Sequence, residues 1–577
     1  EIISTFFGVG VLTRQVKEAG LLAQLDVKRG SKRVATVATD GSWEVAEAKA
    51  WTQSTPKISL NMEAHEQYDA RREKSLRFSP AQELCKADAG PWKNLQPRDV
   101  ALMTKQPFTF KSFRSAKLVT ANGLQFCLPV TRLTHPGVIE ANAKTSMFCG
   151  MATMLVLEKK TTVEIQTEGF RAAVGTGFRV SVNGKTNASG RYVLGAGKHL
   201  LLAFTDGLPD HHGKEKVLRI LKPLDVALEN PLKADHKNPW CFIPFDEFRF
   251  AKDDLDYFLP QDHDRDPEIK TCRDGYHAEI ARLLKCVADL ESFQKELGKR
   301  AKCLPVDKMF CNDVHWKFPR RTVVGSADKL VEAPDALLFD HQEFTTVHPS
   351  LKGDVELCYD LGEQNCGYYS FDLVAEEGGS IDIAGIEHIE PDGELDHTGY
   401  YKNSLHYVTK AGPNRFTSLK RRSGRFVFIT LRGFRKPVKI RHVNLIESTY
   451  PVNPIGSFCC SDETLNKIWE ISNRTLKLCM EDAFTDCPLY EQTLWVGDAR
   501  NEALFAYPVF GATDIGKRCI RLAAQMPDTS PLVACQAPND WAVHLPAWSF
   551  LWGISVWDYY WYSGDAAFIK EIFPAVI

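Results

Sequence analysis

The first 235 residues alternate between apolar and polar positions in short runs that turn residues separate. LLAQLDVKR and KRVATVATD are such runs within residues 1–100, and TMLVLE, TVEIQT and KHLLLAF follow within 101–235. A period of two indicates strands with one buried face, and the pair Asn183-Gly184 favours a hairpin turn. Many short strands without a helical period are typical of β-sandwiches. We therefore predict an N-terminal β-sandwich region over 1–100 and a second β-sandwich over 101–235.

Residues 236–330 differ, because their apolar positions recur at the spacing of a helix. The positions that share one helical face are Ile280, Leu283, Leu284, Val287, Leu290, Phe293 and Leu297. This spacing predicts an amphipathic helix within a linking segment. Alternation returns over 331–452, in runs such as VELCYDLG and RRSGRFVFITLRGF with Gly-Gly and Asp-Gly turns between them. We predict a further β-sandwich there.

The period becomes helical again over the remaining residues, 453–577. SDETLNKIWEISNRTLKLCM carries one apolar stripe, and Ser461 is suited to cap its start. The run DWAVHLPAWSFLWGISVWDYYWYSGD is apolar on every side, which indicates a helix buried inside a helical assembly. Its tryptophans, all expected in the core, are Trp548, Trp552, Trp557 and Trp561. We expect the chain to end before such a helical domain is closed.

Length and charge limit the class of protein. A chain of 577 residues exceeds the roughly 250–300 residues that one core supports, so several domains are expected. A net charge of -2 argues against a nucleic-acid partner, which would need a basic surplus. No apolar run approaches the roughly 18 residues of a membrane span. The start, EIISTFFGVGVLTRQV, lacks the basic region and cleavage site of a signal peptide, and we interpret it as a processed or truncated end.

The 16 cysteines are scattered along the chain, without the Cys/His spacing of a zinc site. We expect free thiols in a reduced compartment and hence a cytoplasmic location, with disulfides in a secreted protein as the alternative. The run FTDGLPDHHGK carries Asp206, Asp210, His211 and His212, but too few carboxylates for an oxygen cage. We interpret it as a polar loop and predict no metal site.

One stretch of the helical region, residues 482–511, gathers acids among aromatic side chains. Asp486, Glu491 and Asp498 are interleaved there with Tyr490 and Trp495 in DAFTDCPLYEQTLWVGDARNEALFAYPVFG. The stretch has the pattern of a loop that runs into a helix. Aromatic faces stack on sugar rings, and carboxylates bind hydroxyls and transfer protons. A sugar site is therefore one interpretation of this stretch, and a structural acid cluster is the other.

Glu491 is the candidate general acid of such a sugar site. Glycoside hydrolysis typically uses a protonated acid for the leaving oxygen and a second carboxyl opposite it. The apolar neighbours of Glu491, Tyr490 and Trp495 among them, would raise its pKa by removing water. Asp486 and Asp498 can converge on the same pocket from a loop that enters a helix. They would accept hydrogen bonds from sugar hydroxyls, while Trp495 would stack on a pyranose face.

Several stretches resemble one known family. DCPLYEQTLWVGD resembles the catalytic motif of the bacterial α-L-rhamnosidases, glycoside hydrolase family 78. CYDLGEQNCGYYSFDLVAEEGGSIDI, IEHIEPDGELDHTGYYKNSLHY and RRSGRFVFITLRG resemble the β-domain before the barrel, and HEQYDARRE and LQPRDV resemble the N-terminal β-region. The resemblance implies a multidomain fold in which N-terminal β-sandwich domains precede an (α/α)6 six-hairpin barrel. Residues 453–577 would be the start of that barrel, truncated at its C-terminus.

The resemblance also implies an activity, that of an inverting exo-hydrolase that removes terminal α-L-rhamnose without a cofactor. By motif position, Glu491 would be the general acid. Asp486 and Asp498 would bind rhamnose, and Trp495 would form a wall of the sugar pocket.

The motif departs from the commoner family form, DCPxRDERxGWxGD. It is one residue shorter, and Tyr490 stands where an Arg is frequent, although the seven-residue spacing from Glu491 to Asp498 is kept. The missing Arg leaves the exact sugar open. Tyr490 remains a candidate substrate-binding residue, and Trp541 is a further candidate that would reach the pocket from a neighbouring loop.

The general base of the family is a Glu far downstream in the barrel, and we expect this chain to end before it. The 577 residues alone would then have little or no hydrolase activity. Two alternatives stay open: a non-catalytic carbohydrate-binding protein, and a helical-barrel glycosidase for another sugar. The partners we expect are a rhamnose-containing oligosaccharide or glycoside and, for the assembly, a homodimer; neither nucleic acid nor a membrane is expected.

Overall fold

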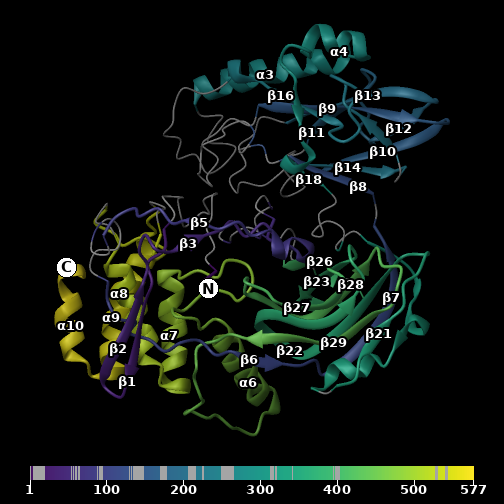
Figure 1. Ribbon diagram of the computed structural model, residues 1–577. Coiled ribbons are helices and arrows are strands. Elements are labelled where there is room, and N and C mark those ends of the chain that lie inside the picture. Colours follow the sequence, from purple (N-terminus) through teal and green to yellow (C-terminus); the bar gives the residue numbers. More distant parts are fainter. Residues whose placement is uncertain are drawn as a thin grey trace.

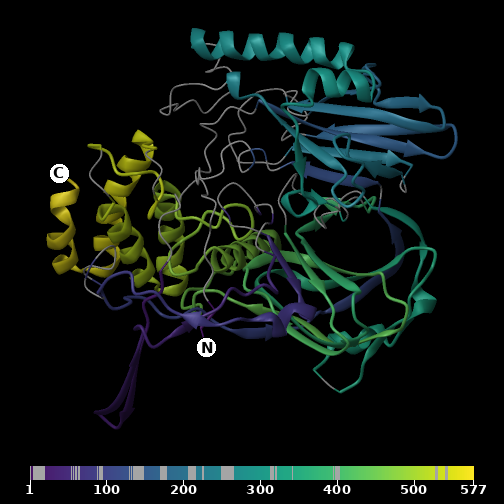
Figure 2. The ribbon, with the colours of Figure 1, turned by 45° about the horizontal axis from the view of Figure 1, so that its top comes forward.

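In a computed structural model, the protein has three parts, of which the largest sheet forms one (Figure 1). The large sheet occupies one side, the C-terminal helices stand beside it, and a smaller sandwich lies above it (Figures 1 and 2). The structure describes residues 2–3, 20–52, 55, 58, 62, 65–86, 89, 95–121, 123–128, 130, 133, 148–168, 178–205, 216–223, 226–248, 266–311, 318, 321–340, 342–393, 395–396, 403–526, 530–539 and 543–577.

The smaller sandwich consists of a five-stranded and a six-stranded sheet. The first sheet has the order β12 (Arg191–Leu194), β10 (Thr161–Glu168), β14 (Lys216–Lys222), β8 (Leu124–Leu128), β18 (Phe310–Cys311). The second has the order β11 (Phe178–Val182), β13 (Gly197–Thr205), β9 (Cys149–Leu157), β16 (Trp240–Pro244), β17 (Lys302–Leu304), and β15 (Ala227–Glu229) also pairs with β9. Apolar side chains such as Leu155, Leu218 and Trp240 fill the space between the sheets.

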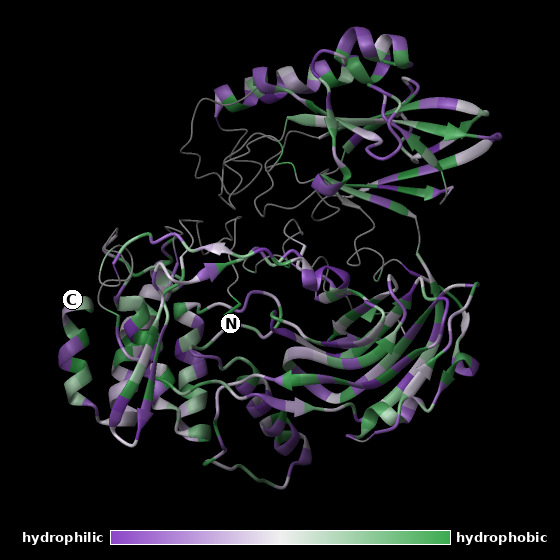
Figure 3. Ribbon diagram, in the orientation of Figure 1, coloured by the Kyte–Doolittle hydropathy of each residue, from purple (hydrophilic) through white to green (hydrophobic). Residues whose placement is uncertain are grey.

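Two helices cover the outer face of the six-stranded sheet, where hydrophobic and hydrophilic residues alternate along their ribbons (Figure 3). Asp266 caps α3 (Pro267–Cys286), and Asp289 caps α4 (Leu290–Leu297) through a capping box. The predicted single helix is thus two helices. Their apolar faces pack on β9, β13 and β16. Residues 236–330 therefore add strands and a helical layer to the sandwich, which differs from the linking segment expected for this range.

The large sheet has twelve strands. Its main order is β20 (Val331–Glu332), β21 (Thr345–Val347), β29 (Val438–Glu447), β22 (Asp354–Ala375), β28 (Arg422–Arg432), β23 (Ser380–Ile386), β26 (Ser404–Val408), β4 (Glu66–Asp69). Four more strands pair at its sides: β6 (Gln106–Phe108), β7 (Ser112–Thr120), β19 (Thr322–Ser326) and β27 (Gly412–Thr417). Alternate residues of β22, β28 and β23 are buried in one apolar core, as their period of two predicts.

The N-terminal strands contribute mainly to this large sheet. β4 pairs in parallel with β26, β6 pairs with β29, and β7 pairs with β22. Within the described part of the first 100 residues, the other strands form two small antiparallel pairs: β1 (Gln24–Arg29) with β2 (Lys32–Ala38), and β3 (Glu44–Val45) with β5 (Ser79–Pro80). The separate N-terminal sandwich expected over 1–100 is thus not what these described strands form, and residues 101–120 belong with the large sheet.

The C-terminal part is helical, as its period predicts. It contains α6 (Glu463–Leu478), α7 (Val496–Phe510), α8 (Thr513–Ala524), α9 (Pro546–Ser563) and α10 (Ala566–Ile572). Helix α9 packs against α7 and α8 through one side that includes Trp552, which is only 4% exposed. Trp557 and Trp561 are 60% and 74% exposed, so the prediction that they are core residues is wrong. No described element covers the second apolar side of α9.

Two expectations from composition bear on the described residues. Every cysteine whose side chain the structure describes is a free thiol, which agrees with the expected free thiols. None of the helices among the described residues combines the length and apolar character needed to cross a membrane.

Candidate active site

The acid-and-aromatic stretch forms an irregular loop between α6 and α7. The backbone folds back on itself, because the N–H of Asp486 donates to the carbonyl oxygen of Thr493 at 3.1 Å. The N–H of Thr493 in turn donates to Asp486 Oδ1 at 3.3 Å. Gln492 adopts a left-handed conformation with φ of 51°, which closes the turn. Asp486 is thus held at the base of a tight loop, and Glu491 lies near its tip.

Glu491 is fixed by two of its neighbours. The indole Nε1 of Trp495 donates to Glu491 Oε2 at 2.6 Å. The Glu491 N–H donates to the sulfur of Cys487 at 3.3 Å, and the Cys487 thiol donates to Asp486 Oδ2 at 2.9 Å. The structure therefore brings three of the predicted site residues, Asp486, Glu491 and Trp495, into one linked cluster.

Asp498 joins the site from the first turn of α7, where a carboxylate interacts favourably with the helix dipole. Trp548 of α9 donates its indole N–H to Asp498 Oδ2 at 3.1 Å. The indole ring packs so closely on Gly497 that a Cβ there would lie 2.8 Å from three ring atoms. Trp548, predicted only as a core residue, therefore also orients one of the site carboxylates.

Glu502 is a fourth acid of this cluster and was not among the residues predicted from the sequence. Burial, followed by the charges of Asp486 and Asp498, raises the pKa of Glu502 well above its usual value. Glu502 lies one helical turn after Asp498 on α7, so the spacing of four residues on one helix face was the signal available in the sequence.

The pKa of Asp486 is also raised, to about 6. Burial is the main cause; the charges of Glu491 and Asp498 add to it, while hydrogen bonds from Cys487 and Thr493 oppose it. Within the described part of the chain, no Lys or Arg side chain forms an ion pair with any of the four acids. The raised pKa values of Asp486 and Glu502 favour retention of a proton, as is common at proton-transfer sites.

Tyr490 points away from this cluster toward the large sheet. Its hydroxyl donates to Glu387 Oε2 at 2.7 Å, and Glu387 lies between β23 and β24 (His388–Ile389). No sequence signal linked these two residues, which are 103 positions apart. The predicted role of Tyr490 in substrate binding stays a prediction.

The segment after α8 borders the loop. Trp495 and Gln536 form an antiparallel bridge, and the Val496 N–H donates to the carbonyl oxygen of Cys535 at 2.9 Å. This places residues 535–537 beside the start of α7. Trp541, the remaining predicted site residue, lies outside the described residues, as does the run from Asp206 to His212.

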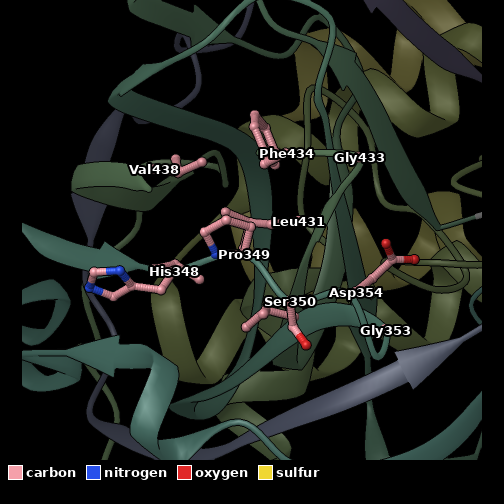
Figure 4. A pocket seen from close by; sticks show the side chains of 11 residues that line it. His348, Pro349, Ser350, Gly353, Asp354, Leu431, Gly433, Phe434 and Val438 are labelled. Carbon is pink, nitrogen blue, oxygen red and sulfur yellow. The ribbon is translucent and has the colours of Figure 1, made fainter. Parts of the chain in front are cut away.

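A small depression lies away from the acid loop. One depression at the rim of the large sheet, near His348, Asp354 and Phe434, has a volume of about 20 Å³ (Figure 4). A space of this size holds a water molecule and no sugar. Among the described residues, no group of three or more His, Cys, Asp and Glu side chains could hold a metal ion.

Comparison with known proteins connects this geometry to one family. Residues 453–577 match the family model of the bacterial alpha-L-rhamnosidase 6 hairpin glycosidase domain. An alpha-L-rhamnosidase of Formosa agariphila is 24% identical over 240 residues, which are 38% of this chain and 25% of that protein. The crystal structure of a GH78 family rhamnosidase of Bacillus sp. GL1 superposes with a TM-score of 0.81 and 28% identity, over 99% of this chain and 59% of that chain.

This chain therefore spans a quarter of the first relative and about three fifths of the second. The matches confirm a mostly-sheet N-terminal region followed by a six-hairpin glycosidase domain. They also confirm the resemblance on which the sequence analysis relied. By its C-terminal domain and its overall fold, the chain is similar to the bacterial α-L-rhamnosidases, the enzymes of glycoside hydrolase family 78.

Proposed function

We propose that the protein carrying this sequence is an inverting exo-glycosidase that hydrolyses terminal α-L-rhamnose. In this proposal Glu491 protonates the leaving oxygen, Asp486 and Asp498 bind sugar hydroxyls, and Trp495 forms one wall of the pocket. The observation that carries the proposal is the cluster itself: Glu491 is held at 2.6 Å by an indole, among acids without a described cation partner. Such a cluster destabilises a fold, so function is the better reason for it.

The chemistry needs little from Glu491 beyond a proton and a fixed position. An inverting reaction places a general base on the opposite face of the sugar, about 6.5–9.5 Å from the acid, with the attacking water between them. We assign this base to no residue of the sequence. The neighbouring acids Asp486 and Glu502, whose pKa values are raised, can accept or share protons as sugar hydroxyls bind.

The test is hydrolysis of a nitrophenyl α-L-rhamnoside by the full-length protein, with the first sugar product followed by proton NMR. Inversion predicts that β-L-rhamnose forms first. Glu491→Gln should lower the rate on unactivated rhamnosides by about 10³-fold, within the usual contribution of a general acid. Glu463→Gln is the matched control, because Glu463 is an exposed acid in the first turn of α6.

Three outcomes would contradict parts of the proposal. Near-normal rates for Glu491→Gln would remove this residue as the acid. Rhamnose binding without turnover would favour a carbohydrate-binding protein, and turnover of another sugar only would favour a different helical-barrel glycosidase.

A further inference from the structure

The large sheet reaches directly into the acid loop through Glu387. One carboxylate oxygen of Glu387 accepts the hydroxyl of Tyr490 at 2.7 Å, and the other accepts a hydrogen bond from the amide of Gln364. Gln364 lies in β22, and its amide also donates to the hydroxyl of Ser423 in β28 at 2.9 Å. Glu387 is therefore fixed by two central strands of the sheet before it meets the loop.

The same part of β22 also holds the helix that precedes the loop. The guanidinium of Arg474 in α6 donates to the carbonyl oxygen of Gln364 at 3.0 Å and forms an ion pair with Glu447 at 3.3 Å. Just after α6, Glu481 pairs with Arg421 of the sheet domain at 2.6 Å. The entry to the loop is thus anchored on the sheet, and the Tyr490 contact anchors its tip.

The position of Tyr490 makes this second anchor important. Tyr490 immediately precedes Glu491, so a fixed Tyr490 side chain limits how the Glu491 backbone can move. Cys487 and Trp495 fix Glu491 from within the loop, whereas Glu387 is a support from another domain. Because the Tyr490 hydroxyl donates its proton to Glu387, we interpret this hydrogen bond as a support of the loop.

We propose that Glu387 and Tyr490 are positioning residues, and that their hydrogen bond makes the large sheet part of the machinery that places the Glu491 carboxyl for proton transfer. This inference rests on the proposed role of Glu491. Protonation by a general acid accelerates hydrolysis most when the leaving group is poor. Misplacing the acid should therefore lower kcat more for rhamnosides with a poor leaving group than for those with a good one. A merely structural contact would affect all substrates equally.

The test compares Tyr490→Phe, Glu387→Ala and the double variant in the full-length protein, on a nitrophenyl rhamnoside and on an alkyl rhamnoside. We expect kcat on the alkyl rhamnoside to fall about tenfold, and kcat on the nitrophenyl rhamnoside to change less than about twofold, with KM nearly constant. The double variant should lose no more than either single variant, because all three remove the same hydrogen bond. Glu387→Gln should recover much of the rate, since its amide oxygen still accepts.

Tyr559→Phe is the matched control, because Tyr559 also donates to a carboxylate, that of Asp565 at 3.1 Å, away from the acid loop. It should leave the ratio of the two rates unchanged. Equal losses on both substrates, additive losses in the double variant, or a rise in KM alone would overturn the proposal; the last result would make Tyr490 a substrate-binding residue.

Backbone hydrogen exchange separates this inference from the proposed function. Tyr490→Phe should speed exchange in peptides that cover residues 486–495, whereas Tyr559→Phe should not. If the protein hydrolyses no rhamnoside, the proposed function fails and faster exchange still supports the contact as a support of the loop. Unchanged exchange would overturn the positioning role in either case.

Discussion

Two groups of carboxylates in this protein have opposite surroundings. The sheet cluster consists of Asp354 and Asp382 with His406 and Arg432, on β22, β23, β26 and β28. The loop cluster consists of Asp486, Glu491, Asp498 and Glu502, around the start of α7. Both are at least partly buried, yet among the described residues only the first contains cations.

In the sheet cluster, each acid has a partner. His406 Nδ1 lies 2.6 Å from Asp382 Oδ1, and Arg432 bridges Asp382 at 2.7 Å and Asp354 at 2.5 Å. Although burial alone would raise it, the pKa of Asp382 is held well below its usual value by His406 and Arg432. Asp382 therefore stays ionised, and its contacts join neighbouring strands of the large sheet.

In the loop cluster, the pKa values of Asp486 and Glu502 are raised, because burial and the charges of neighbouring acids both act in this direction. Among the described residues, the cluster's other two acids accept hydrogen bonds from neutral donors, the indoles of Trp495 and Trp548. Because both clusters contain buried acids, burial of acids does not by itself indicate a catalytic site. What distinguishes the candidate site is burial without a described cation, which raises the pKa values of Asp486 and Glu502.

Removing the cation from the sheet cluster should have the largest effect on stability. Arg432→Met leaves Asp382 and Asp354 without their shared partner, so we expect a loss of about 3 kcal/mol in the free energy of unfolding. The stabilisation is present above the unfolded-state pKa of about 3.9 and is lost as pH falls toward the lower folded-state pKa. Urea unfolding at pH 7 and pH 3 measures both.

The control for this variant is Arg415→Met. Arg415 pairs with Asp372 at 3.0 Å, but its side chain is 74% exposed, against 8% for Arg432. An exposed pair of this kind contributes about 1 kcal/mol or less. Equal losses for the two variants would mean that burial does not decide the strength of these pairs.

Gly497→Ala tests the packing that supports the loop cluster. Its Cβ would lie 2.8 Å from three ring atoms of Trp548, which cannot bend away as a flexible chain would. Displacing the ring should cost about 2 kcal/mol and weaken its hydrogen bond to Asp498. Thermal unfolding measures the first effect, and rhamnoside hydrolysis measures the second.

Gly553→Ala is its control, because Gly553 also lies in a helix, α9, and its Cβ would meet nothing within 4 Å. Alanine is the better helix former there by about 1 kcal/mol, so this variant should be neutral or slightly stabilised. A similar loss in both variants would assign the effect to helix geometry and not to Trp548.

Asp486→Asn should have the smallest effect on the free energy of unfolding, and it should stabilise the protein and not destabilise it. The pKa of Asp486 is about 6 in the folded protein, above the unfolded value of about 3.9, so the folded state binds the extra proton. The ionised group therefore destabilises the fold above pH 6, and this cost disappears as pH falls toward 4. At pH 7.5 the variant should be more stable by about 1 kcal/mol, and at pH 4 it should match the wild type.

Asp289→Asn is the control for this pH test, because the pKa of Asp289 is lowered and not raised. Hydrogen bonds from the Ser292 side chain and backbone lower the pKa of Asp289, so neutralising it should bring no gain at pH 7.5. Calorimetry at the two pH values measures the difference. A gain for Asp289→Asn as well would point to net charge, and not to the loop cluster, as the cause.

Local patterns predicted much of the local structure. Alternation predicted the strands β22 and β28, and the helical period predicted α6 and α9, because both depend on neighbouring residues alone. The spacing of acids and aromatics brought Asp486, Glu491, Trp495 and Asp498 into one hypothesis. Glu502 was within reach of the same reasoning, one turn beyond Asp498.

Patterns failed where a residue's partner is distant in sequence. Residues 112–120 pair with β22 and not within the sandwich predicted over 101–235. Residues 240–244 extend the sandwich sheet, although they lie in the range predicted as a linking segment. Trp557 and Trp561 have the same composition around them as Trp552, and their exposure depends on which side of α9 meets α7 and α8.

The sequence by itself determined where the acids stand relative to one another, because a loop that enters a helix fixes side chains within about two turns. It also revealed the resemblance to the bacterial α-L-rhamnosidases, through a motif whose residues are contiguous. Only the tertiary structure decided that Glu387 supports Tyr490 across 103 positions, and that Asp382 meets Arg432 while Asp486 meets no described cation. Electrostatic surroundings and strand pairing depend on distances in space, and such distances are set when the whole chain packs.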